Sequence, residues 1–172
     1  MPLIVEDGTG RADAESYASV AQADEYHQKR GTAGWTGDEA AKEAALRRAT
    51  DYLDGAYRTR WLGQAAMLEQ SLAWPRAFVR DERAYLPSDA VPAAVVRACC
   101  EAALRELQSP GSLAPDLFPG ERVVSETVGP LSVEYADGGG SDAGAPPVLV
   151  AVDRILAPVL RSAAAAGLVL RA

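Results

Sequence analysis

The side chains that most often carry catalysis are scarce in this sequence. It has one histidine, His27, whereas triad-type catalysis by serine or cysteine needs such a base beside the nucleophile. The adjacent cysteines Cys99 and Cys100 could form only a strained disulfide, so we predict two small buried apolar residues. No histidine, cysteine or carboxylate cluster has metal-ligand spacing. We therefore predict no catalytic residue, no metal and no cofactor, and expect His27 to be a partly exposed helix residue.

Phosphate-binding loops are also missing from the sequence. Gly8, Thr9 and Gly10 form half of a dinucleotide-binding loop, but the third glycine is absent. Lysine occurs only as Lys29 and Lys42, and neither follows a glycine-rich loop. Three kinds of function are considered: an enzyme, a nucleic-acid-binding protein and a structural protein that binds other proteins. An enzyme of unknown type is the weakest of the three.

Arginines and aromatic residues are interleaved in the middle of the chain, as in proteins that hold single-stranded nucleic acid. The cations are Arg47, Arg48, Arg58, Arg60, Arg76, Arg80 and Arg83, with Trp61, Trp74 and Phe78 among them. The same stretch contains Asp51, Asp54, Glu69, Asp81 and Glu82. Seven positive and five negative charges leave only +2, and the formal net charge of the chain is -7. We therefore favour a protein-binding surface that includes Trp74 and Arg76, and expect nucleic-acid binding no tighter than about 10⁻⁴ M.

Chain length and composition indicate one packed domain or, as an alternative, two small ones. A chain of 172 residues with 48% hydrophobic residues can bury a core, and its many alanines favour close helix-on-helix packing. No signal peptide opens the sequence, and no uninterrupted apolar stretch approaches the ~20 residues of a membrane span. We expect a soluble protein that is intracellular when made and has no membrane partner.

Helical periodicity predicts four helices, near residues 20–30, 38–54, 91–108 and 148–160. The expected end signals are Ser19 with Gln22, Thr36 with Glu39, Gly55 as a stop, and Ser88 or Asp89 as a cap. A further short helix is expected around residues 65–72, and extended chain at Trp74 and Pro75.

The period changes to two over residues 123–135, which predicts a β-hairpin with its turn at Gly129 and Pro130. The predicted fold is mainly α, a small helical bundle with one protruding β-hairpin and an extended C-terminal segment. We divide the chain into a bundle core (1–122), the hairpin with a flexible Gly-rich linker (123–147), and a C-terminal helix and tail (148–172).

Two apolar segments have no obvious place in such a bundle. One is the hairpin tip, formed by Val128, Gly129, Pro130 and Leu131; the other is the tail, with Leu168, Val169 and Leu170. An isolated two-stranded hairpin is only marginally stable. We therefore expect both segments to pack on a neighbouring subunit or another protein.

Several segments, in order, resemble a family of phage neck proteins. They are VEDGTG (5–10), Ser16 with Tyr17, ALRRATDYLD (45–54), LAWPR (72–76), VPAAVVRA (91–98) and ETVGPLSVEY (126–135). Each is weak alone, but their order and spacing extend from residue 3 to about 160. The family carries the label DnaT-like single-stranded-DNA-binding protein, and is also similar to the helical head-tail connector proteins of long-tailed phages.

The connector resemblance implies a homo-oligomeric ring, typically a dodecamer, located in the neck of the virion and assembled in the host cytoplasm. Its partners would be the portal protein above and a stopper, tail-terminator or tail protein below, with DNA passing through the channel without specific binding. Because the acidic balance suits a channel, we favour a structural head-tail adaptor. The alternative is a DnaT-like accessory replication protein that binds single-stranded DNA.

Overall fold

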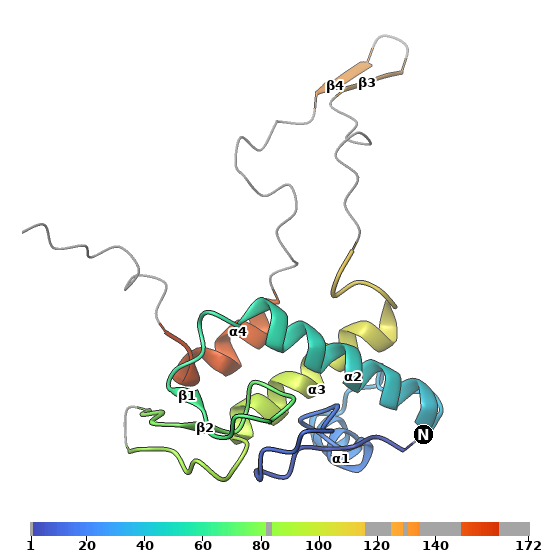
Figure 1. The fold of residues 1–172 in the computed structure, drawn as a ribbon. Coiled ribbons are helices and arrows are strands. Elements are labelled where there is room, and N and C mark those ends of the chain that lie inside the picture. Colours follow the sequence, from blue (N-terminus) through green and yellow to red (C-terminus); the bar gives the residue numbers. More distant parts are fainter. Residues whose placement is uncertain (1, 82–83, 116–124, 129–130, 135–148, 162–172) are drawn as a thin grey trace, which may run out of the picture.

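The computed structural model describes residues 2–81, 84–115, 125–128, 131–134 and 149–161 (Figure 1). The helices are α1 (Val20–Arg30), α2 (Glu39–Ala56), α3 (Ala93–Gln108) and α4 (Val150–Leu156), and the 3-10 helix η2 (Ala157–Val159) continues α4. The strands are β1 (Gln64–Ala65), β2 (Arg76–Ala77), β3 (Ser125–Val128) and β4 (Leu131–Glu134), paired as β1–β2 and β3–β4. The prediction of a mainly α fold with a small hairpin is confirmed.

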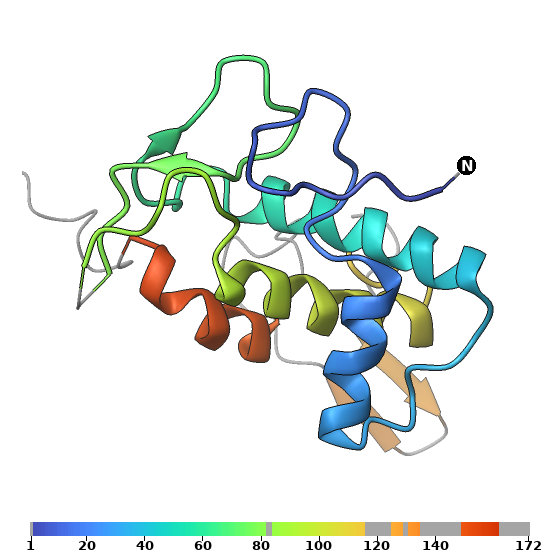
Figure 2. The same cartoon turned by 90° about the horizontal axis from the view of Figure 1, so that it is seen from below.

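The helices form one packed body. The α2 helix lies along α3, α4 packs against α3, and α1 contacts both α2 and α3. Both views place the end of α2, the start of α3, η2 and the β1–β2 pair at one end of this body, away from α1 (Figures 1 and 2). None of the helices among the described residues is long and apolar enough to cross a membrane.

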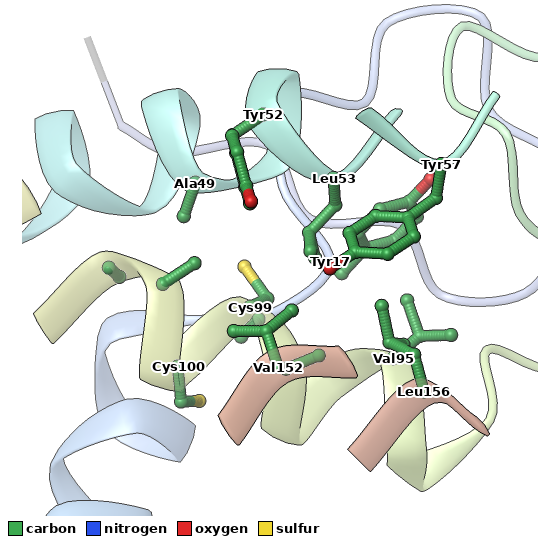
Figure 3. Packing of buried hydrophobic residues seen from close by; sticks show 14 of the residues in the cluster. Tyr17, Ala49, Tyr52, Leu53, Tyr57, Val95, Cys99, Cys100, Val152 and Leu156 are labelled. Carbon is green, nitrogen blue, oxygen red and sulfur yellow. The ribbon is translucent and has the colours of Figure 1, made fainter. Parts of the chain in front are cut away.

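A single hydrophobic cluster joins the helices. Leu53 of α2, Val95 of α3 and Leu156 of α4 are fully buried, and the side chains of the three helices point toward one another (Figure 3). The predicted C-terminal helix therefore shares the core of the preceding helices. Both cysteines are free and buried there, as expected.

Local capping signals account for the helix boundaries only in part. The Ser19–Gln22 capping box is present, and Gly31 ends α1 in the left-handed conformation. The box expected at Thr36 is wrong, because Asp38 caps α2 through the Ala41 N–H at 2.8 Å.

Two further end signals were also misread. The α2 helix continues through Gly55 to Ala56, so the predicted stop is wrong. The α3 helix begins at Ala93 with Pro92 at its N-cap and no side-chain cap, so neither Ser88 nor Asp89 caps it.

The short helix expected around residues 65–72 is also wrong. Gln64 pairs with Ala77, and Ala65 pairs with Arg76, in a short antiparallel ladder. The Ala66 N–H then donates to Pro75 O at 3.1 Å. Long-range pairing with β2 thus overrides the local apolar pattern from which the helix was predicted.

The second hairpin matches its prediction. Val128 pairs with Leu131, the two residues on either side of the predicted turn. Gly129, Pro130, the linker at 136–147 and the tail residues Leu168, Val169 and Leu170 lie outside the described residues. The interface roles predicted for the hairpin tip and the tail stay predictions.

Candidate nucleic-acid interface

Two exposed aromatic rings and an exposed arginine lie along the segment between β2 and α3. Phe78 is 74% exposed and Tyr85 is 69% exposed, although large apolar rings usually lie in cores. Arg80, also exposed, places its guanidinium carbon 6.0 Å from the centroid of the Tyr85 ring. We call Phe78, Arg80 and Tyr85 the aromatic–arginine surface.

Tyr85 and Arg80 lie on paired segments of backbone. They form an antiparallel bridge, and the Leu86 N–H donates to Val79 O at 2.8 Å. Successive residues of an extended chain point to opposite faces, and Val79 is fully buried. Burial of Val79 therefore fixes Arg80 and Tyr85 on the outer face.

Phe78 also has an unusual backbone conformation. Its φ is 59°, a left-handed value that is rare for a bulky side chain. Gly63 makes room for the chain here, because a Cβ atom at residue 63 would lie 2.2 Å from Ala77 O. Strained backbone of this kind is concentrated at functional sites, which singles out Phe78 as a candidate binding residue.

Arg76, which we predicted to contact a partner, is half-buried and binds three backbone oxygens. Its guanidinium donates to Leu62 O at 2.7 Å, to Gly63 O at 2.9 Å and to Ala73 O at 3.2 Å. Burial lowers the pKa of this guanidinium. These bonds hold the backbone on both sides of the β1–β2 pair, and the predicted contact of Arg76 with a partner stays a prediction.

Trp74, the other predicted contact residue in this region, is fully buried. Its ring meets the Trp61 ring edge-on at 5.8 Å between centroids. In this structure its side chain therefore offers no surface to a partner. The sequence pattern of an arginine beside a tryptophan did not distinguish a core residue from an interface residue.

The arginines of the chain differ in whether an acidic side chain pairs with them. Arg47 pairs with Glu15 at 3.0 Å, Arg48 with Glu106 at 2.9 Å and Arg60 with Asp153 at 3.4 Å. Within the part of the chain that the structure describes, Arg58, Arg80, Arg97 and Arg161 form no ion pair. All four of these arginines are exposed.

These four arginines belong to elements that meet at one end of the molecule, whereas Arg30 and Arg105, which also form no ion pair among the described residues, lie near the far ends of α1 and α3. Arg58 follows α2, Arg97 lies in α3 one turn from its start, and Arg161 follows η2. The Arg161 N–H donates to Arg60 O at 2.7 Å, which joins the end of α4–η2 to the end of α2. Positive charge is thus available around the aromatic–arginine surface despite the acidic balance of the whole chain.

The residues capable of covalent or metal chemistry are placed differently. His27 is 1% exposed, which corrects the expected partial exposure, and its ring stacks on Trp35 at 4.7 Å. Burial lowers the pKa of His27, and its Nε2 lies 3.2 Å from Cys100 O. Over the described ranges, no group of three or more histidine, cysteine or acidic side chains could hold a metal ion.

Comparison with known proteins identifies a family. The family described as "Putative DnaT-like ssDNA binding protein" matches the chain over residues 1–172. No curated protein and no solved structure matches the chain.

This match corrects the function that we favoured from the sequence. The family is described by single-stranded DNA binding, so the prediction of a structural head-tail adaptor in the virion neck is wrong. The alternative, a DnaT-like single-stranded-DNA-binding protein, fits better. The ring, the portal and tail partners and the location in the particle were inferred with the adaptor and have no support from the match.

Proposed function

Since the chain belongs to this family of DnaT-like proteins, we propose that it binds single-stranded DNA through the aromatic–arginine surface. The observation that carries the proposal is the exposure of Phe78 and Tyr85 on either side of Arg80 along the chain. Proteins that bind single strands stack bases on aromatic rings and track the backbone with cations.

Each part of the surface has a defined task in this proposal. Phe78 and Tyr85 present ring faces or edges to unstacked bases, and every base has a face on which such stacking is possible. Arg80 lies between them in sequence, contacts the Tyr85 ring and carries a charge for a phosphate. Arg58, Arg97 and Arg161 add further cations at this end of the molecule.

The charge distribution limits how tight this binding is. A net charge of -7 repels DNA at long range, and few phosphates meet a cation that has no acidic partner. We expect a dissociation constant of about 10⁻⁶ to 10⁻⁴ M near physiological salt, in the range of nonspecific binding. The tight end of this range goes beyond the limit of about 10⁻⁴ M expected from the sequence, because stacking on Phe78 and Tyr85 adds to the phosphate contacts.

The same geometry predicts a preference for single strands over duplex. In a duplex the base faces are covered by their neighbours, so Phe78 and Tyr85 have nothing to stack on unless base pairs open. Only the phosphate contacts remain, and these are common to both forms.

The test is an equilibrium titration of the full chain against two fluorescein-labelled oligonucleotides of equal length, at the same salt concentration. One is a mixed-sequence single strand without self-complementarity, and the other is the same strand annealed to its complement. We expect the single strand to bind at least tenfold more tightly. Equal affinity for the two, or no binding of the single strand at millimolar protein, would overturn the proposal.

A further inference from the structure

Arg97 of α3 lines a hollow beside the aromatic–arginine surface. The hollow has a volume of about 560 Å³ and lies between residues 81–86, the start of α3 and η2. Arg97 and Asp81 are its charged residues, and its other walls are apolar: Leu86, Pro92, Ala93, Ala94, Ala157, Pro158 and Val159. A concave, mostly apolar site with a few polar groups is typical of a small-ligand pocket.

The guanidinium of Arg97 keeps two nitrogens for a ligand. Arg97 shares one face of α3 with Ala93 and Ala94, since residues three and four apart lie on the same side of a helix. Its Nε donates to Ala93 O at 3.1 Å. Its Nη1 and Nη2 form no hydrogen bond or ion pair with any residue that the structure describes. Arg97 therefore brings a planar pair of unused donors to the hollow.

Tyr85 and Leu86 connect the hollow to the aromatic–arginine surface. Leu86 lines the hollow, whereas Tyr85 is exposed on the outer face of the same extended segment. A strand that stacks one base on Tyr85 reaches the hollow by crossing the edge of this segment. Because the two sites adjoin, we expect the occupant of the hollow to be a base of the bound strand.

The unused donors of Arg97 match the edge of one purine better than that of the other. Guanine carries two adjacent acceptors, O6 and N7, which a guanidinium binds through two parallel hydrogen bonds. Adenine carries N7 beside an amino group, so one of the two donors would face another donor. The aliphatic walls suit the flat face of either purine, and the choice between them therefore depends on Arg97.

We infer that the hollow receives one purine of the bound strand and that Arg97 makes it prefer guanine to adenine. The inference rests on the single-strand binding proposed above and adds a specificity to it. A contact between Arg97 and a phosphate would add the same affinity to every strand, because phosphates carry no sequence information. A contact with guanine instead changes the ratio of affinities between two strands.

The test compares two oligodeoxythymidylates of equal length, one with guanine and the other with adenine at every third position. We expect the wild-type chain to bind the guanine strand at least about fivefold more tightly, the lower end of the discrimination that one bidentate base contact provides. In Arg97→Gln the preference should reverse, because a glutamine amide pairs with N6 and N7 of adenine. Arg97→Ala is the matched control, which loses the same charge and should bind the two strands equally.

A further variant tests the position of the base. Ala157→Leu fills the hollow from an exposed position and leaves Arg97 in place. It should remove the guanine preference, while binding of unsubstituted oligodeoxythymidylate stays unchanged.

The outcomes separate this inference from the proposed function. Equal affinity of the wild-type chain for the two strands, or a guanine preference that persists in Arg97→Gln or in Ala157→Leu, overturns the inference and leaves the aromatic–arginine surface standing. If neither strand binds, the proposed function fails, and the guanine preference fails with it.

Discussion

The hydroxyl of Tyr17 donates a hydrogen bond to Oδ1 of Asp54 at 2.5 Å, which joins the segment before α1 to the end of α2. The same pair reaches the chain that leads to β2. Asp54 Oδ2 accepts from the Ala73 N–H at 2.8 Å, and the Tyr17 hydroxyl accepts from the Trp74 N–H at 3.2 Å. This buried network fixes the backbone from which the aromatic–arginine surface extends, and burial raises the pKa of the Asp54 carboxyl.

Tyr17→Phe tests whether that network stabilises the fold. Tyr17 is 1% exposed, so loss of its hydroxyl leaves the Trp74 N–H without its acceptor and removes one donor from Asp54. We expect the free energy of unfolding in urea to fall by about 1–3 kcal/mol. Tyr85→Phe is the control, because the exposed Tyr85 should lose its hydroxyl at no cost. Equal stability of the two variants would contradict the account.

Two glycines should respond to alanine in opposite directions. Gly8 has a φ of 101°, and a Cβ atom there would lie 2.1 Å from Asp89 O, so Gly8→Ala should destabilise the fold. Gly55 lies within α2 with no atom within 4 Å of its Cβ position, so Gly55→Ala should stabilise it by about 0.5–1 kcal/mol. Thermal melting of both variants measures the difference, and a lower melting temperature for Gly55→Ala would be inconsistent with the observed α2.

His27 gives the stability of the fold a defined dependence on pH. Because burial lowers the pKa of His27, the folded protein keeps the ring neutral, while the unfolded chain protonates near pH 6.5. The contribution of the neutral His27 ring to the free energy of unfolding is therefore full above pH 6.5, and it is lost as the pH falls below that value. Urea midpoints from pH 8 to pH 5 should decline for the wild type and less for His27→Gln. Since the chain has one histidine, parallel profiles would show that His27 is not responsible.

Arg80 should account for one part of the salt dependence of DNA binding. Each phosphate contacted in a single strand contributes about 0.7 to the slope of log K against log salt concentration. Arg80→Ala should reduce the slope by about that amount, as measured by titrations at several salt concentrations. Arg105→Ala is the matched control, since Arg105 is exposed near the other end of α3. An unchanged slope in Arg80→Ala would remove Arg80 from the interface.

The helices could be predicted because their signals are local. Ser19 and Gln22 stand three residues apart, and their reciprocal bonds form wherever that spacing begins a helix. The β1–β2 pair could not be predicted in the same way. Gln64 and Ala77 meet only because the chain between them is held by distant groups, including Asp54.

The candidate interface was visible in the sequence as a mixture of arginines and aromatic residues, but its members could not be sorted. Trp74 and Phe78 look alike in sequence, and only packing separates the buried ring from the exposed one. The charge count along the central stretch also left out acidic partners from elsewhere in the chain, since Arg48 pairs with Glu106, which lies outside the stretch. The true surface depends on which arginines keep their charge unpaired, which is a property of the fold.

The most direct measurement is the affinity of the double variant Phe78→Ala/Tyr85→Ala for single-stranded DNA. Both side chains are exposed, so the melting temperature should stay at the wild-type value, while loss of two stacking positions, at about 1–3 kcal/mol for each base, should weaken binding more than tenfold. The control, Leu68→Ala/Val150→Ala, removes two other exposed apolar side chains and should bind like the wild type. Wild-type affinity in the Phe78→Ala/Tyr85→Ala protein would contradict the assignment of single-strand binding to this surface.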